Sequence, residues 1–206
     1  MASVGLLYVG AILFINGVCL LGHISAKGAA PLNFFVGAVQ VFTPTYLVVS
    51  ADGDPATIAG AAGLYLFGFT YLWVGLNNLM GWDGRGLGWF SLFVVVVGLG
   101  FAAHDGFEVG NWPSAVMWLM WAVLWFMFFV LLGLGKTAWT AATGWVAAVE
   151  GVVTGGLPAM LMLTGHWRAD AAFAIGLAVA GAVMLALVAP ASKALAAKPA
   201  VAAAAV

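Results

Sequence analysis

Seven long apolar segments, separated by short polar breaks, constrain this chain more than any other feature. Most of them approach the roughly 20 residues that an α-helix needs to cross a bilayer, and the fourth is short. Charged residues make up only 6% of the 206, too few to cover a soluble domain of this size. The sequence therefore predicts an all-α membrane protein, a compact bundle of seven transmembrane helices. The expected segments are Val4–Leu21, Leu32–Ser50, Thr57–Leu79, Gly88–Ala103, Ser114–Leu134, Ala138–Thr164 and Ala171–Ala189.

Charge is distributed unequally between the two sets of breaks. The odd-numbered breaks and the C-terminal tail carry five of the six basic residues, and the even-numbered breaks carry five of the seven acidic residues. Basic residues concentrate on the cytoplasmic side of membrane proteins, which predicts an N-terminus outside and a cytoplasmic C-terminus. The sequence contains no basic tract, which argues against nucleic acid as a partner. The residues concerned are Lys27, Arg85, Lys136, Lys193 and Lys198, and Asp52, Asp54, Asp105, Glu108 and Asp170.

One carboxylate, Glu150, lies midway along the sixth apolar segment. An ionisable side chain at the centre of a membrane helix costs about 3 kcal/mol or more, and by default it marks a polar path or site. Thr154 follows at i+4 on the same helical face and could offer a second polar contact. Gly151 and Gly155 form a GxxxG pair, which allows a neighbouring backbone to come close. A hydrogen-bonded structural carboxyl is the alternative to a carboxylate that lines a pore.

Aromatic side chains form a stripe along the fifth segment and a pair on the third. Trp118, Trp121 and Trp125 fall at i, i+3 and i+7, so they lie within about 60° of the helix circumference. Trp125 lies too deep for the interfacial belt in which membrane tryptophans usually occur. Phe67 and Tyr71 share a face at i and i+4, and the Tyr71 hydroxyl needs a partner in lipid. A deep aromatic stripe alone is more often core packing, but the pair on the third segment supports its interpretation as the wall of a solute path.

Amide side chains add polar positions inside the apolar segments, with Asn16 in the first and Asn77 and Asn78 near the end of the third. Hydrogen bonding between helices is their simplest role. One carboxylate, flat aromatic faces and a few amides suit an uncharged, planar, hydrogen-bonding solute such as urea or a short amide. Polar atoms at intervals would replace part of the water that this solute loses.

Other functions are disfavoured by what the sequence lacks. The seventh segment has no lysine before Lys193 at its end, which argues against a retinal-binding protein. His23, His104 and His166 all lie at segment edges, so no nucleophile is paired with a histidine at depth and an enzyme is not expected. A proton-coupled carrier usually needs a relay of ionisable groups, and here one carboxylate stands alone. No cofactor and no metal are implied.

Six blocks of sequence resemble, in the same order, the AmiS/UreI family of bacterial urea channels and amide transporters. The resemblance extends from Leu6 to Trp167. The matching blocks are Leu6–Leu21, Asn33–Ala38, Leu66–Asn78, Trp89–Val94, Met117–Phe126 and Val149–Ala159.

This resemblance implies a six-helix core, here residues 1–168, with its own pore in each protomer of a homohexameric ring. The seventh helix, residues 169–192, is additional to that core, and the alanine-rich residues 193–206 are expected to form a disordered cytoplasmic tail. The matched motifs imply pore-wall roles for Glu150, Trp118, Trp121, Trp125, Phe67 and Tyr71, and for Leu6, Val9 and Leu13 of the first helix.

Residues and resemblance together predict a passive channel for urea or short aliphatic amides in the bacterial cytoplasmic (inner) membrane, supplying a cytosolic urease or amidase. The alternative is a proton-coupled amide transporter in which Glu150 takes up and releases a proton. Acid-gated members of the family carry a long outer loop with histidine between the second and third helices. Here that loop is about Ala51–Pro55 and contains no histidine, so acid gating is not expected. His104 and His166 could still sense pH.

Overall fold

The computed structural model describes residues 2–196, and within them seven helical spans are long and apolar enough to cross a membrane. This confirms the expected fold class. The first three spans are α1 (Ala2–Leu20), α2 (Ala26–Val49) and α3 (Pro55–Met80), and the last is α8 (Ala171–Leu195). Helix α8 continues three residues past the predicted boundary at 192. The rest of the predicted tail, residues 197–206, lies outside the described residues.

The fourth span is longer than the sequence suggested. Helix α4 (Arg85–Ala103) continues into the π-helix η1 (His104–Glu108), which makes a span of 24 residues, so the expectation of a short fourth segment was wrong. The polar residues of η1 concealed this continuation. They are hydrogen-bonded locally, since His104 Nδ1 lies 3.1 Å from Glu108 Oε2 and the Ser114 hydroxyl donates to Asp105 Oδ2 at 2.5 Å.

The fifth and sixth spans also contain π-helices. Helix α5 (Trp112–Phe128) ends in η2 (Phe129–Gly133). The sixth span is built from the following elements in order: η3 (Thr137–Trp139), α6 (Thr140–Glu150), the π-helix η4 (Gly151–Gly156) and α7 (Leu157–Leu163). Pro158 lacks a backbone N–H and its ring disfavours regular α-helix before it, which accounts for the wider turn of η4. Glu150 therefore lies where α-helix changes to π-helix.

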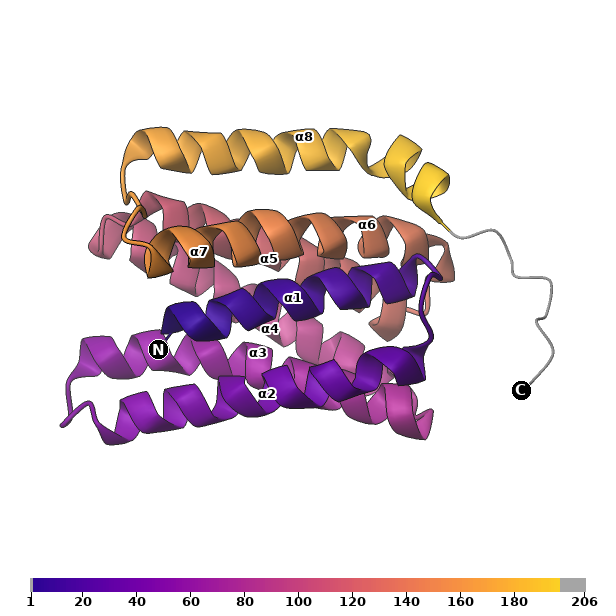
Figure 1. The fold of residues 1–206 in the computed structure, drawn as a ribbon, viewed down its shortest axis with the longest axis horizontal. Coiled ribbons are helices and arrows are strands. Elements are labelled where there is room, and N and C mark those ends of the chain that lie inside the picture. The colour runs from indigo at the N-terminus through magenta and orange to yellow at the C-terminus, as the bar shows by residue number, and fades with distance from the viewer. Residues whose placement is uncertain (1, 197–206) are drawn as a thin grey trace.

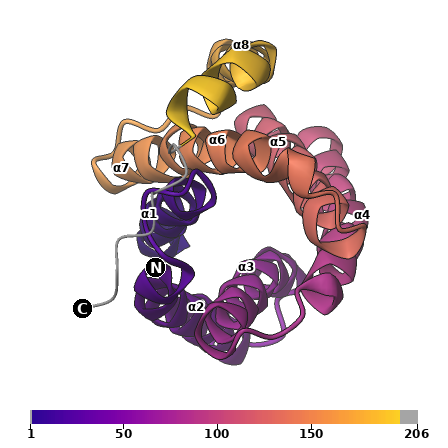
Figure 2. The same cartoon turned by 90° about the vertical axis from the view of Figure 1, so that its right-hand side faces the viewer.

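The first six spans follow one another around a ring, and α8 lies outside it beside α5 and α6 (Figures 1 and 2). Short turns connect the spans and cap the helices. Asp54 accepts a hydrogen bond from the backbone N–H of Thr57 at 2.9 Å and another from its hydroxyl at 2.6 Å. These hydrogen bonds, from the hydroxyl first and the N–H second, hold the pKa of Asp54 below its ordinary value.

Glycines close the ring where α1 meets the sixth span. A Cβ atom on Gly10 would lie 2.5 Å from the Gly151 carbonyl oxygen and 2.9 Å from the Gly155 carbonyl carbon. Further along, a Cβ on Gly17 would lie 2.6 Å from the carbonyl oxygen of Gly144. The predicted role of the Gly151 and Gly155 pair is confirmed, because the backbone of α1 packs directly on it.

Helix α8 is attached to the outside of the ring. The Trp145 indole N–H of α6 donates to the Met184 carbonyl oxygen at 3.2 Å, and Gly181 allows Met120 of α5 to pack closely. At the far end of α8, His23 Nε2 lies 2.7 Å from the Leu195 carbonyl oxygen. The seventh helix therefore covers α5 and α6 without entering the ring.

Candidate functional site: a path along the axis of the ring

Three cavities lie in a row inside the ring. The first lies at the end where α1 begins and is lined by Ser3, Asp105 and Ser114 among others; we call it the Asp105 cavity. It shares two wall residues, Phe67 and Trp121, with the second, which we call the central cavity. The third, the Asn77 cavity, lies at the other end of the ring, and Asn77, Leu20 and Trp82 are among its wall residues. The residues that it shares with the central cavity are Asn16, Val74, Leu87 and Phe128.

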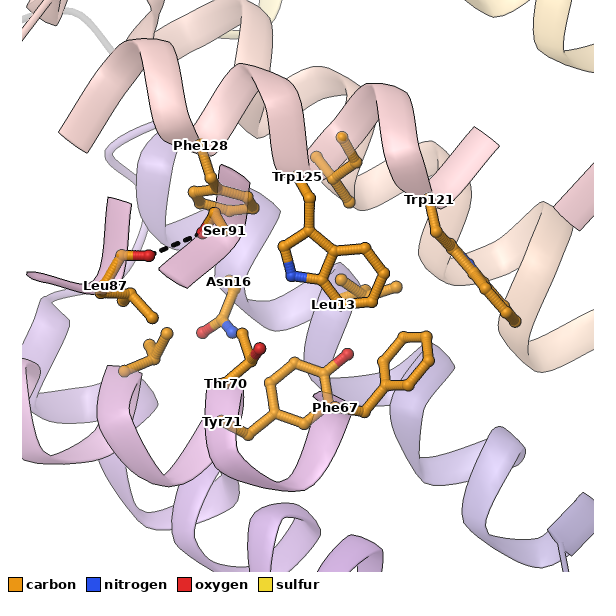
Figure 3. Close-up of a pocket in the computed structure, with 12 residues that line it drawn as sticks. Leu13, Asn16, Phe67, Thr70, Tyr71, Leu87, Ser91, Trp121, Trp125 and Phe128 are labelled. Atoms are coloured by element: carbon orange, nitrogen blue, oxygen red, sulfur yellow. Dashed lines mark hydrogen bonds between the residues drawn. The ribbon is translucent and has the colours of Figure 1, made fainter. Parts of the chain in front are cut away.

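The central cavity, drawn in Figure 3, has the smallest volume of the three. It offers about 30 Å³ to the centre of a water-sized molecule, whereas each flanking cavity offers about 260 Å³. A volume of about 10–15 Å³ measured in this way holds one water molecule. The central cavity therefore has room for about two or three waters. A solute that passed along the row would lose most of its hydration here.

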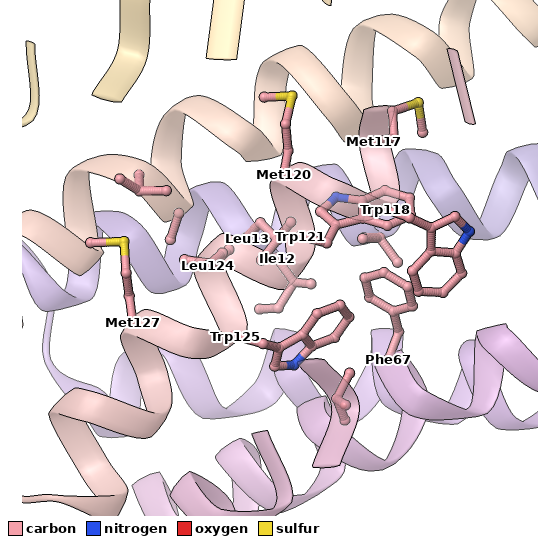
Figure 4. Packing of buried hydrophobic residues seen from close by; sticks show 14 of the residues in the cluster. Ile12, Leu13, Phe67, Met117, Trp118, Met120, Trp121, Leu124, Trp125 and Met127 are labelled. Carbon is pink, nitrogen blue, oxygen red and sulfur yellow. The ribbon is translucent and has the colours of Figure 1, made fainter. Parts of the chain in front are cut away.

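Aromatic rings build the constriction. The Phe67 ring centroid lies 4.9 Å from that of Trp121 and 4.8 Å from that of Trp125, at interplanar angles of 82° and 57°. Trp118 meets Trp121 edge to face at 5.1 Å. Figure 4 shows the rings of Phe67, Trp118 and Trp125 gathered on one side of α5, while Met120 and Met127 extend on the other. Tyr71 stands beside Phe67 at 6.3 Å. The structure thus brings all five predicted aromatic residues together.

Polar atoms line the central cavity between these rings. The Tyr71 hydroxyl is buried and has no hydrogen-bond partner among the described residues. Asn16 forms a reciprocal amide pair with Asn33 of α2, with N···O distances of 3.0 and 2.8 Å. The hydroxyls of Thr70 and Ser91 donate to backbone carbonyls of their own helices, at 2.7 and 2.8 Å. The cavity wall therefore offers one free hydroxyl and several oxygens whose remaining lone pairs can accept.

Glu150 occupies a different position from the other predicted residues. Its side chain is fully buried, and neither carboxyl oxygen has a hydrogen-bond partner among the described residues. It does not line any of the three cavities. A chain of hydrogen bonds connects it to the aromatic wall, because the Trp121 indole N–H donates to Thr154 Oγ1 at 2.8 Å and Thr154 donates to the Glu150 backbone carbonyl at 2.6 Å. Contact between the carboxyl group and a solute stays a prediction.

The other predicted residues lie along the row. Leu6 and Val9 line the Asp105 cavity, and Leu13 lines the central one. Asn77 and Asn78 line the Asn77 cavity, where the side-chain oxygen of Asn77 has no partner among the described residues. Several polar wall residues were not predicted as such from the sequence, where their only signal was a single polar residue within or beside an apolar run. These are Gln40, Thr70, Ser91, Asp105 and Ser114.

Comparison with known proteins gives consistent matches over most of the chain. The model of the AmiS/UreI family of transporters matches residues 1–166. A protein of Mycolicibacterium smegmatis, whose name proposes transport of amidate substrates, is 53% identical over 96% of this chain and 92% of its own length. The acid-activated urea channel of Helicobacter pylori is 33% identical over 81% of this chain and its own full length.

Solved structures of the Helicobacter pylori urea channel match the fold. The cryo-electron microscopy structure of its closed state superimposes with a TM-score of 0.74, at 32% identity over 82% of this chain and all of that one. The crystal structure of the same channel gives a TM-score of 0.71 over the same shares of the two chains. The family match ends at residue 166, so α8 lies beyond it.

Proposed function

This chain belongs to the AmiS/UreI family of transporters, and from that premise we propose that it is a passive channel for urea or short aliphatic amides. It is a multi-pass protein of the bacterial inner membrane. The observation that carries the proposal is the row of three cavities, since neighbouring cavities share wall residues from one end of the ring to the other. A permeation path is the simplest use of such a row, and it requires no catalytic step.

The constriction suits flat, neutral solutes. Phe67, Trp121 and Trp125 meet across the central cavity, so a permeant must present a thin edge to pass between the rings. A charged solute would lose its hydration in the central cavity, whose described wall residues offer no opposite charge. This loss costs far more free energy than the desolvation of a neutral amide. Urea and short amides are planar and neutral, and they carry N–H donors for the oxygens of this wall. Selection by shape and neutrality follows from these walls.

The second part of the proposal concerns hydrogen bonds between the permeant and the Glu150 carboxyl group. The carboxyl oxygens have no hydrogen-bond partner within residues 2–196, and an ionised carboxylate left in that state is very costly. We assign the NH₂ groups of the permeant as the transient donors, reached when Trp121 and its neighbours move aside. The bond from Trp121 to Thr154 ties that movement to the helix that carries Glu150.

A proton-coupled amide transporter is the second candidate, and the same unpartnered carboxyl group favours it. In that mechanism Glu150 would bind a proton on one side of the membrane and release it on the other. Purified protein in liposomes distinguishes the two. Stopped-flow light scattering would measure entry of urea, acetamide and glycerol, with the pH gradient and membrane potential collapsed by ionophores. A channel still equilibrates its solute, whereas a coupled carrier stops accumulating it. No flux above that of protein-free liposomes would contradict both.

We also propose the assembly and physiological setting that the family suggests. Each protomer carries its own path, so a homohexameric ring would hold six parallel paths. The charge distribution supports an orientation with the N-terminus outside and the C-terminus in the cytoplasm. The permeant would then reach a cytosolic urease or amidase. Mass determination of the detergent-solubilised protein tests the hexamer.

A further inference from the structure

Gln40 is a buried polar side chain that the path described so far does not use. It lies in α2 and is 1% exposed, and its side-chain oxygen has no hydrogen-bond partner among the described residues. A primary amide in an apolar surrounding is costly unless it is hydrogen-bonded. Gln40 lies in the wall of the Asp105 cavity, so rotation of its side chain away from Gly5 would bring the amide to a partner in the cavity.

Neighbouring glycines make room for this amide. A Cβ atom on Gly5 of α1 would collide with the Gln40 side-chain oxygen and would lie 3.3 Å from its amide carbon. On the other side, a Cβ on Gly68 of α3 would lie 2.9 Å from the backbone carbonyl of Gln40. Two helices of the ring therefore hold Gln40 by close contact, and any larger residue at Gly5 would displace its amide.

The other polar side chains of the Asp105 cavity are already bonded. The Ser114 hydroxyl donates to Asp105 at 2.5 Å, and Ser3 contacts the Met162 sulfur at 3.7 Å. Among the described residues that line this cavity, Gln40 is the one with a buried side-chain acceptor that has no hydrogen-bond partner. The cavity wall also includes Phe67 and Trp121, which begin the constriction. A solute bound at Gln40 would therefore lie next to the aromatic rings of the constriction, on the side of the Asp105 cavity.

The chemistry of the free group indicates which solutes it would select. A primary amide offers one carbonyl acceptor and two N–H donors, and it can pair reciprocally with a second amide or with urea through two hydrogen bonds. This protein already contains such a pair in Asn16 and Asn33. We propose that Gln40 is a specificity-determining residue that pairs in this way with the permeant and so favours solutes with an unsubstituted amide or urea group. The proposal rests on the channel function proposed above.

Substitution of Gln40 by methionine tests it, because Gln40→Met keeps the length of the side chain and removes both hydrogen-bonding atoms. Proteoliposomes with wild-type or variant protein would be compared for acetamide, urea and water permeability. We expect the ratio of acetamide to water permeability to fall about fivefold, as the loss of one net hydrogen bond predicts. Thr43→Val is the matched control, because Thr43 is a buried polar residue of the same helix that does not line the cavities, and its ratio should not change.

A second variant keeps the test decisive if Gln40→Met does not fold. In Gly5→Ala the Gln40 amide is kept, but the added methyl group occupies the space that the amide oxygen fills in the wild type. We expect the same fall in the ratio of acetamide to water permeability. An unchanged ratio, or an equal loss of water permeability, would overturn the role of Gln40 and leave the channel function standing. A wild-type protein that carries water but neither amide nor urea would overturn the channel function and this proposal together.

Discussion

Trp121 connects the two polar systems of this protein. Its ring packs edge to face on Phe67 with centroids 4.9 Å apart, and its N–H donates to Thr154 beside Glu150. A phenylalanine at this position could fill the space but could not donate. Trp125 has no such bond to η4, although its ring lies 4.8 Å from the same phenylalanine. Substitution of Trp121 therefore tests the hydrogen bond to Thr154, whereas substitution of Trp125 tests how far its ring limits the width of the path.

Trp125→Ala is expected to widen the constriction. Removal of the indole opens the central cavity beside Phe67, so butyramide should gain permeability relative to urea by about tenfold, the lower range of discrimination for added methylenes in an apolar pocket. Stopped-flow shrinkage and swelling of proteoliposomes would give both permeabilities. Trp139→Ala serves as the control, since Trp139 is partly exposed and lies outside the three cavities. An unchanged ratio in the Trp125 variant would show that its ring does not limit the path.

Glu150→Gln separates a hydrogen-bonding role from a proton-carrying one. The amide has nearly the same shape and keeps one acceptor, so a channel should retain urea flux within about tenfold of wild type, the scale of one hydrogen bond. A proton-coupled transporter would lose accumulation driven by a pH gradient altogether. Uptake of labelled acetamide with and without an imposed pH gradient measures both. Thr154→Val, which removes the hydroxyl between Trp121 and the Glu150 backbone, controls for local disturbance.

At the scale of elements, α1 and the sixth span depend on contact between their backbones. Gly10→Ala would place a methyl group against η4, where the nearest backbone atoms leave no room. We expect unfolding to become easier by about 1–3 kcal/mol, the usual cost of overpacking. Thermal unfolding in detergent, followed by circular dichroism, would show a lower midpoint. Gly100→Ala in α4 is the control, because its methyl group would meet open space and its midpoint should not fall.

The turn between α2 and α3 bears on regulation. It comprises residues 50–54, with Asp52 and Gly53 at positive φ, and it contains no histidine. At the same end, His166 is exposed and lies 3.1 Å from the Thr164 hydroxyl, and His104 is half-buried and lies 3.1 Å from Glu108 Oε2. We expect urea permeability at pH 5 to stay within about twofold of that at pH 7.5, since charges at this solvent-facing end of the bundle are largely screened. A steep rise on acidification that disappears in His104→Ala or His166→Ala would contradict this.

The sequence predicted the aromatic face of α5, but it did not predict the surroundings of Gln40 and Glu150. Periodicity placed Trp118, Trp121 and Trp125 on one face, and the structure brings that face to Phe67, because spacing along a helix is a local property. The role proposed for Gln40 was not predicted, because the space for its amide depends on Gly5, which lies on another helix. The position of Glu150 outside the cavity walls likewise depends on how α6 rotates against its neighbours. Packing between helices that are distant in the sequence cannot be predicted from any one segment alone.

At the scale of the whole molecule, α8 lies outside the ring and contributes none of the residues that line the three cavities. The alignment with the Mycolicibacterium smegmatis relative covers 96% of this chain, so it includes at least part of α8. The family model stops before this helix. The walls of the three cavities are therefore built without the seventh helix, and we expect this helix to contribute to stability rather than to selectivity.

A chain that ends after Arg168 tests this separation. Loss of α8 exposes apolar faces of α5 and α6 to lipid, which is itself apolar, so little hydrophobic stabilisation is lost. The Trp145 N–H loses its bond to the Met184 carbonyl oxygen and is left unpaired, which costs about 1–3 kcal/mol. We expect a lower unfolding midpoint in detergent but the same ratio of acetamide to water permeability in proteoliposomes. Trp145→Phe in the full-length chain should reproduce part of the stability loss, because it removes the same bond and keeps the helix. If the shortened protein stays folded but loses its selectivity, α8 must shape the path from outside the ring.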